Sequence, residues 1–262
     1  MSSRITERTI KMGGSREDQL LTARLTDAVN TAEHRGRCHF AGFLDEREAE
    51  LARTLMKSLR FERFLLWGGH EDADRVLFGA FPYHLDPDPS VFPLTAVTVK
   101  FRREDELTHR DLLGGLLSRG IQREALGDIL IETGRAVFFV REEIAPFLTG
   151  QTERIGRAGV RLSLGAEEPL PPAHRFEEIS AVIASPRLDC IVAAFAGLSR
   201  EKAAAAVGAG IVTLNYREET SPSRIVEEGA KLSVRGKGKF IVDRLGPNTK
   251  KGRLCIAGRK YV

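Results

Sequence analysis

The sequence predicts an α+β protein with an N-terminal α/β segment, a middle domain and a small C-terminal domain. Apolar residues recur alternately with helical and strand spacing in the N-terminal third. Two proline-rich stretches, at residues 82–93 and 165–174, interrupt regular structure and mark domain boundaries. Between them the patterns follow the order β-α-β-β-α-β of a ferredoxin-like sandwich. We therefore expect domains at 1–85, 92–166 and 180–245, followed by a basic extension at 246–262.

The N-terminal segment begins with a helical pattern at 15–33 and a short apolar stretch at 38–44. Asp45 is a candidate N-cap for a helix that continues to Leu59. Residues 63–67 and 75–81 are typical of strands, separated by a Gly-Gly turn and an acidic loop.

In the middle domain, alternating β-branched side chains predict a strand at 94–101, and Thr108 is placed to cap a helix to Leu117. A hairpin around Thr133-Gly134-Arg135, a short helix at 142–148 and an extended segment at 154–164 complete the order. Many RNA-recognition (RRM-like) domains share this order, and so do many enzymes. The order alone therefore does not decide the function.

In the C-terminal domain we expect a strand at 179–186, helices at 187–195 and 200–207, and a strand at 211–215. Ser199 is the candidate cap of the second helix. Strands at 231–234 and 239–242 are joined by a basic glycine-rich turn, Arg235-Gly236-Lys237-Gly238. Residues 254–257 are too apolar for a free tail and predict a last strand.

Composition excludes several classes of protein. The longest uncharged apolar stretch, residues 190–198, is about half the length that a membrane-spanning helix needs. The N-terminus has no apolar region of a secretory signal, and three cysteines are too few for a disulfide scaffold. We expect a cytoplasmic protein without membrane contact.

The charge is distributed unevenly along the chain. Residues 180–262 contain fifteen Lys and Arg against seven Asp and Glu, a balance of +8 within a chain whose net charge is +4. A basic C-terminal third on a mildly acidic body is the electrostatic pattern of a nucleic-acid-binding module. The alternative is a solvated basic face that binds nothing.

The sequence contains no Gly-x-Ser-x-Gly, His-Glu-x-x-His or paired Cys-x-x-Cys motif, and no P-loop. His34, Cys38 and His39 are metal-ligand types at close spacing, but no fourth ligand is nearby. We therefore expect no enzyme activity, no metal and no cofactor.

The candidate binding residues are cations in the C-terminal domain. Arg200 and Lys202 lie in the first turn of a helix, where unpaired backbone N–H groups favour a phosphate. Arg187 would join them if the two helices pack side by side. The strand–turn–strand adds Lys231, Arg235, Lys237 and Lys239. We expect these cations to converge on one surface, although for each of them alone a solvated side chain is the more common interpretation.

These residues resemble an S4 (αL-like) RNA-binding domain. The matching stretches are Arg187-Leu188-Asp189, Gly197-Leu198-Ser199-Arg200, Gly210 to Asn215 and Val226 to Phe240. The resemblance implies that Ser199 opens the second helix and that Asn215 leads into a loop with RNA contacts. Many S4 domains have Gly after the Asn, whereas this chain has Tyr216, which would either stack on a base or sugar or cover the hairpin.

The body of the chain resembles the YlmH-like family of S4-domain proteins. This resemblance rests on residues 38–45, 107–114 and 120–129. In that family the middle segment is regarded as an RNA-binding domain, and members are linked to the large ribosomal subunit and to rescue of stalled translation. His109, Arg110, Arg119 and Arg123 would then form a second RNA patch, or instead be helix-end and solvated side chains.

The resemblance implies a non-catalytic RNA-binding protein whose partners are rRNA or tRNA and the large ribosomal subunit. The alternative is an RNA-modifying enzyme or tRNA-acting factor with an S4 appendage. Lys11-Met12-Gly13-Gly14-Ser15 is superficially similar to a class I synthetase signature, but it lies too early in the chain and lacks a partner motif. A cell-division scaffold would leave the basic patch unexplained. No heptad pattern argues for a dimer, so we expect a monomer.

Overall fold

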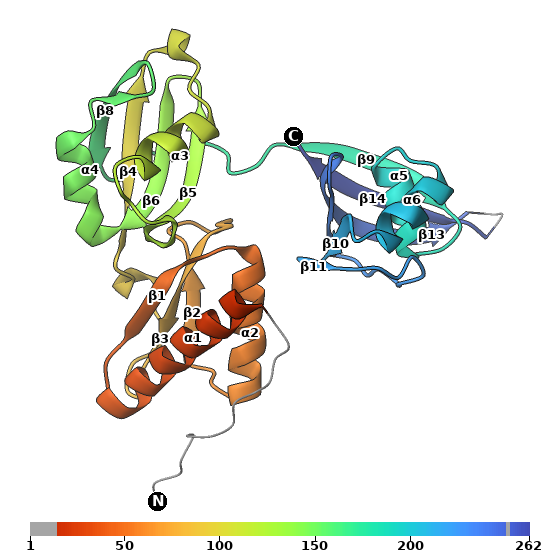
Figure 1. The fold of residues 1–262 in the computed structure, drawn as a ribbon, viewed down its shortest axis with the longest axis horizontal. Coiled ribbons are helices and arrows are strands. Elements are labelled where there is room, and N and C mark those ends of the chain that lie inside the picture. Colours follow the sequence, from red (N-terminus) through yellow and green to blue (C-terminus); the bar gives the residue numbers. More distant parts are fainter. Residues whose placement is uncertain (1–14, 250–251) are drawn as a thin grey trace, which may run out of the picture. The chain divides into compact units, whose positions relative to one another are not determined.

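The computed structural model describes residues 15–249 and 252–262, so Lys11 to Gly14 of the rejected signature and Lys250 and Lys251 of the basic tail lie outside the described residues. The chain divides into two compact units, which we call unit 1 (Met1–Ala173) and unit 2 (His174–Val262). The first two predicted domains both lie in unit 1, and Figure 1 shows the elements of each unit.

Unit 1 contains α1 (Arg16–Arg35), β1 (His39–Leu44), α2 (Glu46–Leu59), β2 (Phe64–Trp67), β3 (Val76–Ala80), β4 (Leu94–Phe101), α3 (His109–Leu117), β5 (Leu126–Glu132), β6 (Arg135–Arg141), α4 (Ala145–Gln151), β7 (Arg154–Ile155) and β8 (Ala158–Leu164). Short 3-10 helices lie at Pro89–Val91, Arg103–Asp105, Arg123–Ala125 and Glu142–Ile144.

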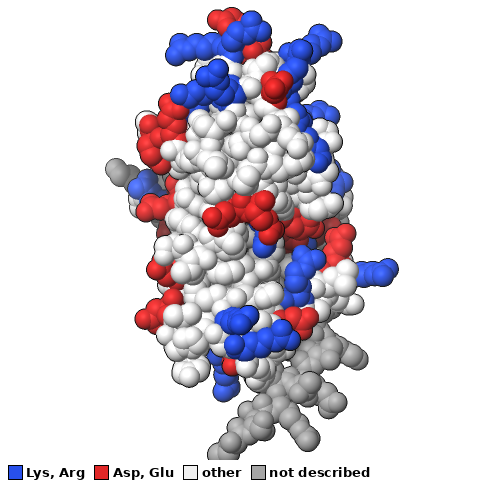
Figure 2. Space-filling model, turned by 90° about the vertical axis from the view of Figure 1, so that its left-hand side faces the viewer, with Lys and Arg blue, Asp and Glu red and all other residues white. Residues whose placement is uncertain are grey.

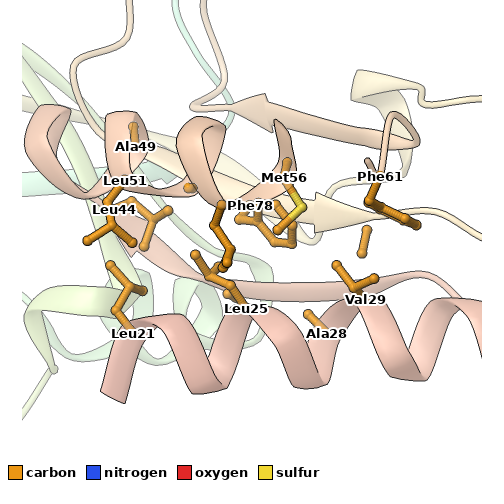
Figure 3. Packing of buried hydrophobic residues seen from close by; sticks show 14 of the residues in the cluster. Leu21, Leu25, Ala28, Val29, Leu44, Ala49, Leu51, Met56, Phe61 and Phe78 are labelled. Atoms are coloured by element: carbon orange, nitrogen blue, oxygen red, sulfur yellow. The ribbon is translucent and has the colours of Figure 1, made fainter. Parts of the chain in front are cut away.

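The N-terminal part of unit 1 is a three-stranded antiparallel sheet of order β1-β3-β2, with α1 and α2 packed against it. Leu25, Met56 and Phe78 are fully buried between these layers, and Figure 3 shows their packing. Asp45 begins α2 with a capping box, because its carboxylate accepts from the N–H of Glu48 while the Glu48 carboxylate accepts from the N–H of Asp45. The cap and the helices predicted here are confirmed.

The middle part is a five-stranded antiparallel sheet of order β5-β6-β4-β8-β7. Its long strands follow the strand order of a ferredoxin-like sheet. The β-α-β-β-α-β order is confirmed, including the Thr108 cap of α3. Two details differ from the prediction: α4 follows a 3-10 turn, and the extended segment at 154–164 is a hairpin that turns at Gly156, where φ is 56°.

The two faces of the middle sheet are covered by different layers. Val97 and Phe138 point toward α3 and α4, where Leu112 and Leu148 are fully buried. The opposite face packs against the N-terminal sheet through Val137 and other apolar residues, namely Phe43, Leu77, Phe81, Leu130 and Phe139. The N-terminal sheet therefore covers the face of the middle sheet that corresponds to the base-stacking face of RRM domains.

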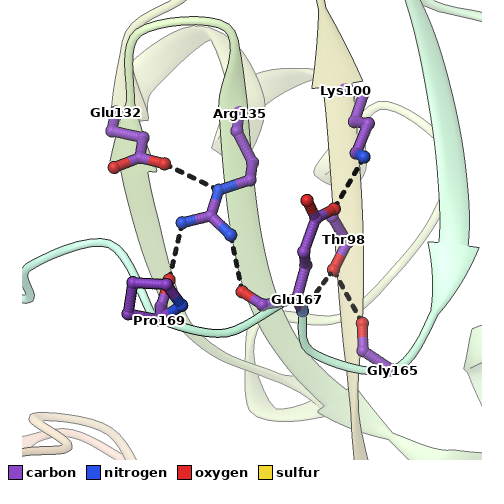
Figure 4. Close-up of polar contacts among 7 residues, drawn as sticks. All are labelled: Thr98, Lys100, Glu132, Arg135, Gly165, Glu167 and Pro169. Carbon is purple, nitrogen blue, oxygen red and sulfur yellow. Dashed lines mark hydrogen bonds and ion pairs between the residues drawn. The ribbon is translucent and has the colours of Figure 1, made fainter.

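The segment after β8 crosses the same face of the middle sheet, and we call residues 165–173 the strap. Arg135 donates to the carbonyl oxygens of Glu167 and Pro169, each at 2.6 Å, and also binds Glu132 (Figure 4). Thr98 donates to the carbonyl of Gly165 and accepts from the N–H of Glu167. These hydrogen bonds attach the strap to the middle sheet, so the strap is part of unit 1.

Unit 2 contains β9 (Phe176–Ile183), α5 (Leu188–Phe195), α6 (Arg200–Gly208), β10 (Val212–Leu214), β11 (Arg217–Glu218), β12 (Lys231–Val234), β13 (Gly238–Asn248) and β14 (Leu254–Tyr261). They form one antiparallel sheet of order β11-β10-β12-β13-β14-β9, and α5 and α6 cover one face. Leu232, Val234, Phe240 and Val242 point toward these helices. The last strand predicted at 254–257 is confirmed, although it is longer and pairs with β9.

The proline-rich stretch at 82–93 has no strand or α-helix and contains only one 3-10 turn, at Pro89–Val91. Within the part of the chain that the structure describes, no helix is both long and apolar enough to span a membrane.

Candidate nucleic-acid interface

The N-terminal ends of α5 and α6 lie close together in unit 2. Arg187 is the N-cap residue of α5, and Arg200 is the first residue of α6. The two helices pack against each other, with Val192 and Ala203 buried in the shared core. Side-by-side packing was the condition for Arg187 to join Arg200, and that condition is met.

A buried carboxylate holds the two arginines together. Asp189 is only 3% exposed, and it accepts from Nε and Nη2 of Arg187, both at 3.1 Å. The Nε of Arg200 lies 3.5 Å from Oδ2 of the same carboxylate, the oxygen that also accepts from Nη2 of Arg187. We call Arg187, Asp189 and Arg200 the arginine clamp.

Burial alone would raise the pKa of Asp189. The hydrogen bonds from Arg187 and from the N–H of Cys190, together with the charges of Arg187 and Arg200, outweigh burial and lower it. The Asp189 hydrogen bond in turn raises the pKa of Arg187. Asp189 and Arg187 are therefore both charged at physiological pH, and the carboxylate brings the guanidinium groups of Arg187 and Arg200 together.

Ser199 and Lys202 flank the clamp. The Ser199 hydroxyl accepts from the N–H of Lys202 at 3.3 Å, so this side chain is engaged as the cap of α6. The Lys202 side chain is exposed in the first turn. Arg224 also lies beside the clamp, because its carbonyl accepts from the N–H of Leu188 while its side chain is 62% exposed. Arg224 could not be identified from the sequence, because it comes close to Leu188 only when residues 219–226 fold back on α5.

Asn215, Tyr216 and Lys231 form a second group at the turn between β10 and β11. The turn consists of Asn215 and Tyr216, and both have positive φ, 47° and 65°. The Asn215 side-chain oxygen accepts from the N–H of Lys231 at 3.0 Å, and the Lys231 ammonium lies 5.5 Å from the centre of the Tyr216 ring. Tyr216 thus has a left-handed backbone conformation, in which glycine is favoured.

The third group is the turn between β12 and β13. Arg235 and Lys237 are exposed on it, and the N–H of Arg235 donates to the carbonyl of Ile211, just after the end of α6. Lys239 follows on β13, and Lys260 of β14 passes beside Gly238, within 3.4 Å of where a Cβ would stand. The turn therefore lies at the C-terminal end of α6, away from Arg200 at its start.

The cations do not all share one surface, which corrects the expectation of a single convergent face. Side chains of neighbouring strand residues point to opposite faces. Because Leu232 and Phe240 point toward the helices, Lys231 and Lys239 point to the other face of the sheet. Of the predicted cations, Arg187, Arg200 and Lys202 are gathered at the helix N-termini.

Two residues of the predicted second patch, Arg119 and Arg123, have partners inside unit 1. Arg119 donates to the carbonyls of Gly115 and Arg154, at 2.8 and 3.0 Å. Arg123 donates to the carbonyl of Leu126 at 2.7 Å, and burial followed by the charge of Arg75 lowers its pKa to about 10.

His109 and Arg110 open α3. Desolvation and the nearby charge of Arg123 lower the pKa of His109, while Arg110 is exposed. Arg119 and Arg123 thus make local structural contacts, whereas His109 and Arg110 are both exposed at the start of α3.

Two other groups were not foreseen. Asp128 accepts from His70 and from the N–H groups of Asp74 and Arg75, which ties the loop after β2 to the middle sheet. On the uncovered face of the unit 2 sheet, Phe176 contacts Tyr261 with ring centres 4.9 Å apart, and Arg259 lies over Phe176. Both depend on pairings between segments that are distant in sequence.

Of the residues considered for a zinc site, Cys38 has a structural role in unit 1. Cys38 packs against the apolar cluster between the two sheets of unit 1, and burial raises the pKa of its thiol. Among residues 15–249 and 252–262, no group of three or more His, Cys, Asp or Glu side chains is placed to hold a metal ion.

Comparisons with known proteins agree with this architecture. Residues 87–167 match a family model described as "Putative RNA-binding domain in YlmH". A solved structure, "Cell division protein ylmH from Streptococcus pneumoniae", is similar with a TM-score of 0.50, covering 58% of this chain and 93% of that chain. At 22% identity this likeness concerns the fold alone.

A closer relation appears in sequence. The chain is 31% identical over 191 residues to "Ribosome-associated protein quality control protein P2" of Bacillus subtilis (strain 168), covering 72% of this chain and 74% of that protein. Identity at this level over most of both chains, together with the family model on the middle part, has one explanation: the chain belongs to the YlmH family.

Proposed function

We propose that this protein is a non-catalytic RNA-binding factor that associates with structured RNA on the large ribosomal subunit, either rRNA or tRNA. It would act as a cytoplasmic monomer in translation or in quality control of stalled ribosomes. The name of the Bacillus relative supports the ribosomal setting, and the family model on the middle part supports RNA as the ligand.

We further propose that residues 180–245 form an S4-type domain whose main contact with RNA is the arginine clamp. The observation that carries this proposal is the position of Asp189, which presents two guanidinium groups side by side at two helix N-termini. A guanidinium group binds phosphate oxygens in a planar, bidentate manner, and helix N-termini add backbone N–H groups and a favourable dipole. Lys202 supplies a further charge in the same first turn.

The other predicted residues have supporting parts in this proposal. Ser199 and Asn215 set the local backbone through their hydrogen bonds. Tyr216, Lys231, Arg235, Lys237 and Lys239 would add contacts where a large structured RNA extends beyond the helix ends. Recognition of this kind depends on RNA shape and phosphates, so affinity should fall steeply with salt.

The test is binding of the full-length protein to purified large ribosomal subunits at about 50 and 200 mM salt. Arg187→Gln/Arg200→Gln is compared with Arg53→Gln/Lys57→Gln, which removes the same charge from exposed positions of α2 in unit 1. Loss of two phosphate contacts should weaken binding and reduce the slope of log affinity against log salt by about one per contact. Equal binding by the two folded variants would refute the clamp as the RNA contact.

A further inference from the structure

A second basic site lies in unit 1, at the end of the middle sheet where β4 ends and β8 begins. An open depression of about 430 Å³ is lined there by Lys100, Arg102 and Arg161, with Glu153 as the one acidic side chain. Phe101, Val160 and Gly159 complete the lining. In Figure 2, Lys and Arg side chains gather at this end of unit 1, above a wide uncharged area.

Two of the cations in this depression lie where they destabilise the sheet. Lys100 and Arg161 are direct cross-strand partners of β4 and β8, and like charges at such positions destabilise a strand pair. Lys100 has an ion pair with Glu167 of the strap at 2.7 Å, but both side chains are about half exposed, so its contribution is small. Among the residues that the structure describes, no acidic side chain pairs with Arg161.

The surroundings leave the site accessible. Gly159 is exposed, and a Cβ at this position would meet nothing within 4 Å, so the backbone of β8 can be approached closely. Arg102 is 78% exposed and lies 3.5 Å from Asp105, which leaves most of its guanidinium group in solvent. Phe101 and Val160 also line the depression, while their side chains pack toward the apolar cluster under α3 and α4.

The location also fits the way the sheet is covered. The N-terminal sheet and the strap occupy the face that RRM domains use for stacking. The depression lies beside the strap, at the end of β4 and the start of β8, and no residue of the N-terminal sheet lines it. A ligand of the middle domain that carries negative charge therefore meets cations here without displacing any part of unit 1.

We propose that the depression of Lys100, Arg102 and Arg161 binds the phosphate backbone of RNA, as a second contact besides the arginine clamp. This rests on the proposed function for the class of ligand and adds the site in unit 1. Three cations around an open depression suit a polyanion chain better than a small molecule, because contacts with successive phosphates need neither depth nor enclosure.

The experiment uses the full-length protein and a fluorescein-labelled hairpin RNA derived from a ribosomal helix. Arg102→Gln/Arg161→Gln leaves Lys100 and its strap contact intact, and Arg53→Gln/Lys57→Gln is the control with matched charge. We expect the first variant to bind roughly tenfold more weakly than the control, with a salt slope lower by about one to two. Its urea midpoint should be unchanged or higher, since a like-charge pair is removed.

The clamp variant Arg187→Gln/Arg200→Gln, measured beside it, separates the two proposals. If only the clamp variant loses affinity, the depression is not an RNA site, while the proposed function stands. If only Arg102→Gln/Arg161→Gln loses affinity, the depression is supported, while the clamp is refuted. Displacement of the RNA by polyglutamate at equal charge concentration would also overturn the assignment, because it would indicate a site for acidic protein.

Discussion

Replacing Asp189 by Asn separates geometry from net charge in the proposed RNA contact. The substitution adds one positive charge to unit 2, so an interface that depended only on net charge would bind RNA more tightly. The same substitution removes the carboxylate that holds Arg187 and Arg200 together. An interface that depends on the fixed pair of guanidinium groups would bind more weakly. The two explanations therefore predict opposite signs.

The size of the effect follows from the contacts of Asp189. Hydrogen bonds to a charged group contribute about 1.5–3 kcal/mol each, but the Arg187 and Arg200 side chains are 36% and 58% exposed, so water replaces much of this. We expect the free energy of unfolding of unit 2 to fall by about 2 kcal/mol. Fixing a long side chain on binding costs about 0.5–1.5 kcal/mol, so two released arginines should weaken RNA binding roughly 5- to 150-fold.

The assay is fluorescence anisotropy with the labelled hairpin, at a temperature where urea unfolding shows the variant to be folded. Asp243→Asn is the matched control, because Asp243 binds Arg259 with contacts of 2.9 to 3.1 Å on the sheet face away from the helices. It makes the same change in charge and also releases an arginine. Binding by Asp189→Asn as tight as that of Asp243→Asn would refute the reasoning.

Two predictions concern Gly258 and Arg135, and a third concerns the pH dependence of the Asp189 contacts. Gly258→Ala should lower the free energy of unfolding of unit 2 by about 3 kcal/mol or more, because the new Cβ would stand 2.3 Å from the carbonyl oxygen of Ile241; urea unfolding measures this, and a stable variant would contradict it. Arg135→Ala should release the strap and cost about 2 kcal/mol, seen as faster proteolysis within residues 165–173. The lowered pKa of Asp189 means that its contribution is present above the ordinary carboxyl pKa of about 4 and is lost as the pH falls through the folded-state value. The urea midpoint of unit 2 should therefore drop on acidification, and less so in Asp189→Asn.

Elements whose signals are local could be predicted from the sequence. Asp45, Thr108 and Ser199 all cap the helices expected to follow them, since a cap depends on residues within one turn. The middle domain could be predicted for the same reason, because each strand or helix has its own periodicity. The turn at Thr133 and Gly134 joins β5 and β6 as expected.

Features that depend on distant pairings could not be predicted in this way. The pairing of β9 with β14 brings Phe176 to Tyr261, and no pattern in either segment identifies the other. The register between β12 and β13 places Lys231 and Lys239 on the sheet face away from the helices. A shift of the register by one residue would place them on the helix side instead. The Arg187-Leu188-Asp189 motif was visible, but the reach of Asp189 to Arg200 required the packing of α5 on α6.

The covered face of the middle sheet shows that the segment matched by the family model is not the same as the compact unit of the folded chain. The family model matches residues 87–167. In the folded protein, Leu130, Val137 and Phe139 of that segment are at most 3% exposed because the N-terminal sheet lies over them. A fragment cut at the family boundaries would present this apolar surface to water and would self-associate. The segment matched by the family model is therefore smaller than the compact unit that contains it, and residues 1–173 are the fragment to express.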